Sequence, residues 1–349
     1  RPIYVDKTQM IAVINEFMET DNTYLCVSRP RRFGKTIAGN MLSAYFSKGA
    51  DSRTLFAPYK IAWDPSFESN LNKFNVIKID VNSEFRNTID KNSLIIKLTR
   101  SIQGEMREQF PEISFFDDDA IADCMLKVFS ATGEQFVVIM DEYDVLVREE
   151  VDSALFTQYL DLLNGLFKSD TVRPAIALAY LTGILPVVRD KVQSKLNNFE
   201  EYTMIDAGEL AEFVGFTEDE VKERCCEGTA DFEEIKSWYD GYDLPVVGSV
   251  YNPYSVMKAL KSGRCQSYWR KTSAAESLKN YINMDFEGLQ ETVARLIAGD
   301  KITVNVDSFQ NDFESFESAD DVLTLLIHLG YLTYHETEKT VQIPNEEVR

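Results

Sequence analysis

The sequence has little of the chemistry on which metalloenzymes, disulfide-rich proteins and membrane proteins depend. Among 349 residues there are two histidines, and the five cysteines form no Cys-x-x-Cys pair. A disulfide scaffold, a zinc site or a histidine-based triad is therefore not expected, and the thiols fit a reducing, cytoplasmic setting. No apolar run approaches the roughly 20 residues that cross a bilayer, so we expect no membrane partner.

The sequence also has fewer basic residues than acidic ones. The chain has 36 Lys and Arg against 57 Asp and Glu, a formal net charge of −21. Nonspecific binding to nucleic acid depends on cations that displace counterions, so the bulk charge argues against a DNA-wrapping protein. A local basic face is still compatible with this charge. Because the sequence lacks an initiator Met and ends abruptly at Arg349, we expect a piece of a longer protein.

The length and the hydrophobic pattern predict two or three domains. The first 205 residues alternate short apolar runs with longer helical patterns, which is typical of a parallel α/β sheet. The predicted strands cover residues 24–28, 76–81, 136–140, 176–182 and 202–205. The predicted helices lie near residues 37–48, 92–109, 119–131, 152–168 and 187–197, with an irregular piece at 49–75.

The strand pattern stops at about residue 206. Residues 207–262 predict a lid of short helices, one of which begins with Thr217 as N-cap in a capping box. Residues 263–349 predict helices followed by two strand-like pieces, which resembles a winged-helix module. The expected organisation is a core over residues 1–205, a helical lid over 206–262 and a winged-helix-like α+β region over 263–349.

The strongest motif is the loop Ser-Arg-Pro-Arg-Arg-Phe-Gly-Lys-Thr at residues 28–36. It lies between an apolar strand and an amphipathic helix, which is the context that a phosphate-binding Walker A loop requires. Gly34 lets the backbone approach phosphates, Lys35 would reach the β and γ phosphates, and the Thr36 hydroxyl would ligate Mg²⁺. Arg29 stands where the usual motif has its first glycine, so a backbone conformation reserved for glycine is not expected there.

The side chains next to these residues complete the expected nucleotide site. Arg31 and Arg32 are candidates for a contact with phosphate or adenine. The whole candidate binding segment is Arg31, Arg32, Phe33, Gly34, Lys35, Thr36 and Ile37.

The second motif is the acidic end of the apolar strand at residues 136–140. Asp141 would hold the hydration shell of Mg²⁺, which keeps several waters and takes few carboxylates. Glu142 would act as the general base on an attacking water. The alternative is an acidic turn after a buried strand, and Asp144 is assigned to a turn or salt bridge. The Asp-Glu pair favours hydrolysis, because small-molecule kinases of the P-loop class usually lack the second carboxylate.

Two further residues are candidates for the reaction. Thr182 ends an apolar strand and could orient the attacking water, although it could equally cap the strand. Arg189 could supply positive charge to the transferring phosphoryl group, although most arginines are simply exposed to solvent.

The chain resembles the AAA-ATPase-like proteins of bacteria and some archaea, relatives of the archaeal ATPase and STAND groups. The resemblance rests on the two motifs above and continues over nearly the whole chain. It is carried by residues 4–8, 28–36, 138–144, 179–186, 238–242, 251–254 and 326–331. In that family the first glycine of the loop is normally replaced, as it is at Arg29.

The resemblance implies a P-loop ATPase of the additional-strand, catalytic-glutamate class, with ATP and Mg²⁺ and with sheet order 5-1-4-3-2. It also implies a switch or motor coupled to a PD-(D/E)xK nuclease-like domain, which we expect to be absent from this chain, or to another partner. A homo-oligomer is compatible with it. Residues 4–8 are suspected of contacting adenine on this basis alone.

Two other functions remain open at this point. One is a nucleotide-binding interaction module with little or no turnover. The other is DNA binding through residues 263–349, for which a modest basic cluster is the main feature, although a solvated helix face explains it equally well. The cluster consists of Lys258, Lys261, Arg264, Arg270 and Lys271.

Overall fold

The computed structural model describes residues 4–149, 151–187, 196–228, 230–269, 286, 288–307, 309, 316 and 318–349. The helices of the N-terminal part are α1 (Met10–Met18), α2 (Lys35–Phe46), α3 (Arg53–Phe56), α4 (Phe67–Asn70), α5 (Val81–Asn87), α6 (Leu94–Gln109), α7 (Ile121–Thr132), α8 (Val145–Arg148) and α9 (Ser153–Phe167). The later helices are α10 (Glu218–Glu227), α11 (Phe232–Tyr239), α12 (Pro253–Ser262), α14 (Leu289–Ala298) and α15 (Ala319–Leu329).

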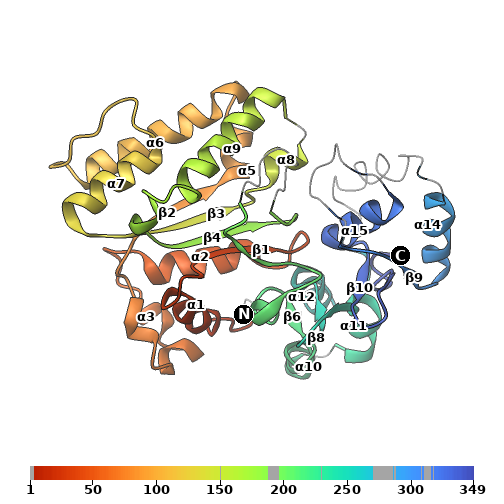
Figure 1. The fold of residues 1–349 in the computed structure, drawn as a ribbon. Coiled ribbons are helices and arrows are strands. Elements are labelled where there is room, and N and C mark those ends of the chain that lie inside the picture. The colour runs from red at the N-terminus through yellow and green to blue at the C-terminus, as the bar shows by residue number, and fades with distance from the viewer. Residues whose placement is uncertain are drawn as a thin grey trace.

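Five parallel strands form the central sheet, which Figure 1 shows edge-on between two groups of helices. They are β1 (Tyr24–Ser28), β2 (Asn75–Asp80), β3 (Phe136–Asp141), β4 (Ile176–Gly183) and β5 (Glu200–Tyr202). The order across the sheet is β2-β3-β4-β1-β5. Read from the β5 edge, this is β5-β1-β4-β3-β2, the succession named above for the family.

The apolar strands are covered on both faces, as their lack of alternation predicted. All residues of β1 and β3 are buried. One hydrophobic cluster lies between the sheet and α6, α7 and α9, and a second joins the opposite face to α1 and α2. The second cluster continues without a break into α15 and the strands that follow it. The C-terminal region therefore shares one hydrophobic core with α1 and α2.

The prediction that strands end at about residue 206 was wrong. The strands β6 (Phe216–Thr217), β7 (Tyr242–Leu244) and β8 (Gly248–Tyr251) form an antiparallel sheet in the order β6-β8-β7. Strands of two to four residues are too short to show the alternating pattern by which strands are recognised. The helix α10 was predicted from its N-cap, and its capping box of Thr217 and Glu220 is confirmed. The helix α11 lies in the stretch where further short helices were expected.

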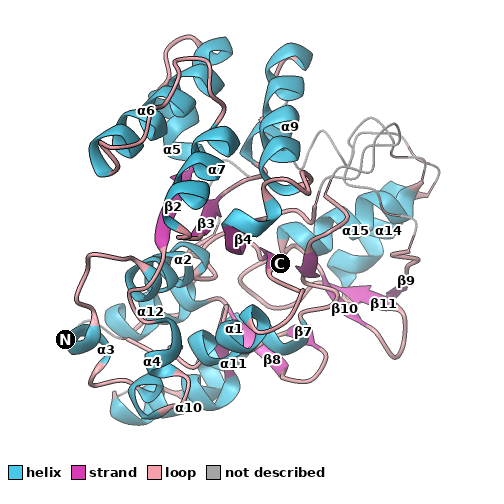
Figure 2. Ribbon diagram, turned by 60° about the vertical axis from the view of Figure 1, so that its left-hand side comes forward, coloured by secondary structure: helices cyan, strands magenta, loops and turns pink. Residues whose placement is uncertain are grey.

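The C-terminal part combines helices with a second small sheet. After α14 comes β9 (Ile302–Thr303), and α15 is followed by β10 (Thr333–His335) and β11 (Thr340–Gln342), which pair as a hairpin. The sheet order is β10-β11-β9. Figure 2 shows this sheet beside α15 and α14, on the opposite side of the molecule from α3 and α6.

Some predicted elements differ from those observed. The sequence analysis missed α1 and α5, and the irregular piece at 49–75 contains the short helices α3 and α4. Most of the helix predicted at 187–197 lies outside the described residues, as do Arg270 and Lys271.

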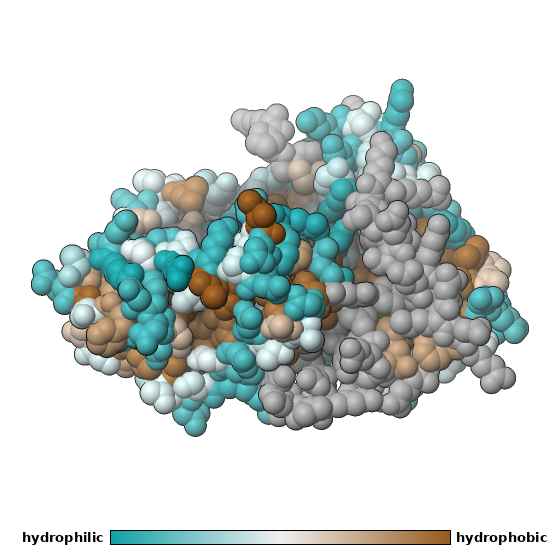
Figure 3. All heavy atoms as spheres, turned by 90° about the horizontal axis from the view of Figure 1, so that it is seen from above, coloured by the Kyte–Doolittle hydropathy of each residue, from teal (hydrophilic) through white to brown (hydrophobic). Residues whose placement is uncertain are grey.

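Among the residues described, no helix is both long and apolar enough to span a bilayer. On the face seen in Figure 3, hydrophobic residues form separate patches among hydrophilic ones.

Candidate functional site

The phosphate loop connects β1 to α2 as predicted. Arg32 (φ 70°) and Gly34 (φ 94°) have left-handed backbone conformations, whereas Arg29 does not. A side chain at Gly34 would meet no neighbouring atom within 4 Å, so glycine is favoured there by its backbone conformation alone. The loop therefore reaches the N-terminus of α2 without the first glycine of the usual motif.

Arg29 has a structural role that the sequence did not indicate. Its side chain is fully buried, and Nη1 donates to the carbonyl oxygens of Ser28 (2.8 Å), Tyr202 (3.0 Å) and Thr203 (3.0 Å). Burial lowers the pKa of Arg29 to about 10. The arginine thus ties the start of the loop to the end of β5 at the edge of the sheet.

Lys35 opens α2 and is folded back on the loop. Its Nζ donates to the carbonyl oxygens of Arg29 (2.8 Å) and Pro30 (2.9 Å). Burial lowers the pKa of Lys35 to about 8, against the opposing influence of Asp144, Glu142 and Asp141. An anion placed over the N-terminus of α2 would restore the charged form of this lysine.

Asp141 ends β3 and lies beside the end of β4. Its Oδ1 accepts hydrogen bonds from the Thr182 hydroxyl and from the backbone N–H of Glu142, the latter at 3.0 Å. Both Asp141 and Thr182 are buried. Thr182 therefore positions the carboxylate of Asp141, and neither side chain is among those that line the cavity described below.

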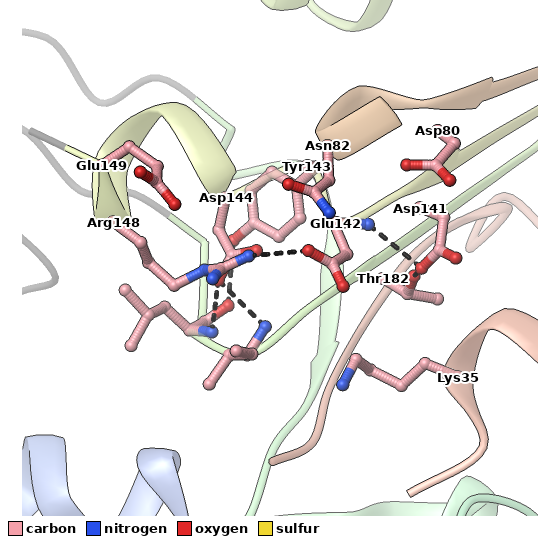
Figure 4. Close-up of polar contacts among 12 residues, drawn as sticks. Lys35, Asp80, Asn82, Asp141, Glu142, Tyr143, Asp144, Arg148, Glu149 and Thr182 are labelled. Atoms are coloured by element: carbon pink, nitrogen blue, oxygen red, sulfur yellow. Dashed lines mark hydrogen bonds and ion pairs between the residues drawn. The ribbon is translucent and has the colours of Figure 1, made fainter. Parts of the chain in front are cut away.

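Glu142 is held by an arginine that follows it by six residues. It has left-handed backbone (φ 52°), and its Oε2 lies 3.1 Å from Nη2 of Arg148. Nε of Arg148 donates to Oδ2 of Asp144 at 3.1 Å. Figure 4 shows Arg148 approaching Glu142 from the side opposite Asp141.

Asp144 anchors this arrangement to the end of β4. Its Oδ2 accepts hydrogen bonds from the backbone N–H groups of Ile184 (2.9 Å) and Leu185 (2.8 Å). Asp144 is fully buried and is a salt-bridge residue, as predicted. Burial alone would lower the pKa of Arg148, but Asp144 and Glu142 raise it above its ordinary value.

Of these groups, Gly34, Lys35, Glu142 and Arg148 border a cavity of about 520 Å³ above the loop. It is lined by Arg31, Arg32, Gly34, Lys35, Thr36, Ile37, Asn82, Arg86, Glu142, Arg148, Glu149, Pro253, Tyr254 and Met257. Five of these side chains are cationic and two are anionic, in a chain whose formal net charge is −21. The cavity concentrates positive charge where a polyanionic ligand would meet the N-terminus of a helix.

The structure brings most of the candidate residues together. Six of the seven residues of the candidate binding segment line the cavity, and so does Glu142. The exception is Phe33, whose side chain lies in the core and packs edge-on against Tyr242 at 5.3 Å between ring centres. Arg189 lies outside the described residues.

Sequence reasoning missed the arginines that α5 and α8 contribute. Arg86 lines the cavity and pairs with Glu149 at 2.6 Å, while Arg148 pairs with Glu142 and Asp144. The spacing of four residues between Asp144 and Arg148 was a usable signal, because such pairs meet on one helix face. The wall contributed by α12 had no comparable signal, since it is more than 200 residues from the loop.

The oxygen donors present fit a hydrated Mg²⁺. The two hydrogen bonds to Asp141 both reach Oδ1, so Oδ2 is the oxygen that can face a cation, and the exposed Thr36 adds a hydroxyl. The described residues hold no group of three or more His, Cys, Asp or Glu side chains suited to a metal. A carboxylate and a hydroxyl are ligands that Mg²⁺ accepts when water and phosphate supply the others.

A five-stranded parallel sheet with a Gly-Lys-Thr loop after β1 and an acidic end on β3 defines a P-loop-like α/β protein. Residues 2–193 match the family model described as Predicted AAA-ATPase (AAA-ATPase-like). The chain belongs to this family, which confirms the resemblance found in the sequence.

One curated relative is an uncharacterized protein in the vnfD 5′ region of Azotobacter chroococcum mcd 1. It is 25% identical over 364 residues, covering 99% of this chain and 63% of the relative. The chain thus spans less than two thirds of the relative's length. Among solved structures, that of Stu0660 of Streptococcus thermophilus is 11% identical, with a TM-score of 0.22 over 75% of this chain and 95% of that one.

Proposed function

We propose that the chain binds ATP with Mg²⁺ in the cavity above the phosphate loop and hydrolyses it. The observation that carries this proposal is the surplus of cationic side chains around the N-terminus of α2 in a strongly acidic chain. A triphosphate supplies the negative charge that this cavity lacks.

Each residue of the loop has a defined task in binding. The first N–H groups of α2 bind phosphate oxygens, and Lys35 exchanges the carbonyl oxygens of Arg29 and Pro30 for the β and γ phosphates. Thr36 and Asp141 would hold Mg²⁺, and Thr182 fixes the Asp141 carboxylate. The ion would supply positive charge against the phosphate oxygens.

Glu142 and Arg148 carry out the chemistry in this proposal. Glu142 accepts a proton from the water that attacks the γ phosphorus, while the bond to the β-γ bridging oxygen breaks and ADP leaves. Glu142 must first separate from Arg148, whose guanidinium then faces the charge that develops on the γ phosphoryl group. This assigns to Arg148 the stabilising role that the sequence suggested for Arg189.

The nucleotide state would be passed on by the later regions. Residues 1–205 form the ATPase core, 206–262 a lid and 263–349 a winged-helix-like region; α14–β9–α15 followed by the β10–β11 hairpin supports the last assignment. The lid is joined to the loop where Asn252 donates to the Arg31 carbonyl oxygen at 3.3 Å. Movement of the lid would transmit the nucleotide state to a nuclease-like domain or another partner.

A second candidate function is a nucleotide-gated module that turns over slowly. The ion pair between Glu142 and Arg148 favours it, because a base held by an arginine is not free to take a proton. DNA binding through the C-terminal region is not proposed. The described members of its basic cluster, Lys258, Lys261 and Arg264, are only three exposed cations in an acidic chain.

The test is Mg²⁺-dependent phosphate release from ATP by the chain and by its Lys35→Ala variant. Lys301→Ala, which removes an exposed lysine paired with Glu338 far along the chain, is the matched control. We expect turnover in the unaltered chain and the control and its loss in Lys35→Ala. Failure of ATP to bind to the unaltered chain would contradict the proposal.

A further inference from the structure

One wall of the cavity offers little to a phosphate. Helix α12 contributes Pro253, Tyr254 and Met257, of which only Tyr254 carries a polar side-chain atom. The arginines, Lys35 and the start of α2 already provide the donors that a triphosphate needs. The side chains of the α12 wall are therefore suited to contact a flat, weakly polar part of the ligand.

A hydrophobic side chain directly after the phosphate loop faces the same cavity. Ile37 follows Thr36 in the first turn of α2 and leaves 64% of its surface exposed. Figure 2 shows α2 and α12 as neighbours, and residues of both line the cavity. An isoleucine exposed beside a phosphate site gains free energy if the ligand covers it.

The loop also builds a stacking surface on this wall. The guanidinium of Arg32 lies 4.1 Å from the centre of the Tyr254 ring, and its Nη1 donates to the carbonyl oxygen of Tyr268 at 3.3 Å. An arginine placed over an aromatic ring extends the surface on which a planar base can stack.

The position of α12 is fixed by contacts on both sides. Asn252 caps its N-terminus, accepting from the N–H groups of Tyr254 (3.0 Å) and Ser255 (3.3 Å). The buried Glu347 near the C-terminus accepts from the Ser255 hydroxyl at 2.7 Å and from the N–H of Tyr268 at 2.9 Å. Tyr254 is thus presented to the cavity by a helix anchored to the end of the described chain.

We propose that Tyr254, Met257 and Ile37 form the binding site for the purine base of the nucleoside triphosphate. The inference rests on the proposed function, which supplies the triphosphate. The base stacks against the Arg32–Tyr254 pair and covers Ile37 and Met257. Because α12 belongs to the region after residue 206, base binding ties that region to the phosphate loop.

The segment suspected on family grounds lies elsewhere. None of residues 4–8 lines the cavity above the loop; Asp6 and Lys7 line a second cavity of about 400 Å³. Lys7 is engaged there with the Glu212 carbonyl oxygen at 2.5 Å and with Glu220 at 2.6 Å. Tyr4 packs against Tyr59 at 5.1 Å between ring centres.

The experiment compares two ligands, ATP and inorganic tripolyphosphate, each with Mg²⁺. Dissociation constants are measured for the unaltered chain and for Tyr254→Ala, Tyr254→Phe and Ile37→Ala. We expect Tyr254→Ala to raise the dissociation constant for ATP about tenfold. Tyr254→Phe should bind ATP as tightly as the unaltered chain, because stacking needs only the ring. Ile37→Ala should weaken ATP about fivefold. Tripolyphosphate should bind all four proteins equally.

The control is Ile297→Ala on α14, which removes an isoleucine of similar exposure (58%) that does not line the cavity. Because Ile37 is largely exposed, its variant tests the site without disturbing the core. Equal losses for ATP and tripolyphosphate, or none for ATP in both Tyr254→Ala and Ile37→Ala, would overturn the base site. Failure of both ligands to bind the unaltered chain would overturn the proposed function instead.

Discussion

Nη2 of Arg148 lies 3.1 Å from Oε2 of Glu142, so the proposed general base is ion-paired to an arginine of its own chain. The arginine is largely buried and also holds Asp144. A triphosphate in the cavity would compete for this guanidinium and free the carboxylate. The same ligand would then be both substrate and trigger.

The first prediction concerns this arginine. Arg148→Ala removes the charge that faces the γ phosphoryl group, so turnover should fall on the order of 100-fold, with ATP affinity changed only a few-fold. Arg148→Lys should recover part of the rate. Single-turnover hydrolysis and equilibrium binding separate the two effects. A rate equal to or above that of the unaltered chain would show that Arg148 only restrains Glu142.

Thr182 should act through Asp141. Thr182→Val keeps the shape of the side chain but removes the hydrogen bond to Oδ1, so the Asp141 carboxylate loses its orientation. We expect the Mg²⁺ concentration for half-maximal ATP binding to rise about tenfold. Thr182→Ser keeps the hydroxyl and should stay close to the unaltered value. If Thr182→Val left the Mg²⁺ concentration for half-maximal ATP binding unchanged, Thr182 would have no role in Mg²⁺ binding.

Binding should depend on pH through Lys35. Burial lowers its pKa to about 8 in the free protein, so the ammonium loses its proton as the pH rises through this value. A bound triphosphate needs the charged form. ATP affinity should therefore be independent of pH just below about pH 8. Above that pH it should decrease, by at most about tenfold per pH unit. Lys35→Arg, which stays charged, should show no such fall. The same profile in both proteins would assign the effect to another group.

Gly183 should be essential for packing at the end of β4. A Cβ atom there would lie 2.8 Å from Cε1 of Tyr143 and 2.9 Å from Cγ of Asp144, and hydrogen bonds fix both side chains. Gly183→Ala should lower the free energy of unfolding by about 1–3 kcal/mol.

Gly104 of α6 provides the control, since a Cβ atom there meets nothing within 4 Å. Gly104→Ala should raise stability by about 0.5–1 kcal/mol, because alanine favours a helix interior. Thermal or denaturant unfolding measures both. Unfolding of Gly183→Ala at the midpoint of the unaltered chain would show that the end of β4 adapts.

The sequence predicted the central sheet well because its strands are buried on both faces. Runs such as residues 136–140 are apolar throughout, and the observed strand β3 extends this run by one residue. The strand predicted at 202–205 is instead β5, Glu200–Tyr202, since a short edge strand has no such continuous pattern. The small sheet of β6, β7 and β8 was missed for the same reason.

The site was predictable where the motif lies within one stretch of chain and not where it depends on tertiary contacts. Lys35, Thr36, Asp141 and Glu142 follow from strand ends and loop chemistry. The burial of Arg29 against the carbonyl oxygens of Tyr202 and Thr203 depends on pairing between β1 and β5, which no local pattern encodes. Tyr254 reaches the cavity only because α12 packs beside the loop.

The central claim is that this cavity hydrolyses ATP with Glu142 as the base. The most direct test measures Mg²⁺-dependent phosphate release and ATP binding for the chain and its Glu142→Gln variant in parallel. We predict that the substitution abolishes turnover while ATP still binds, because glutamine keeps the size of the side chain but cannot accept the proton. Tight binding without turnover in either protein, or equal turnover in both, would contradict this account.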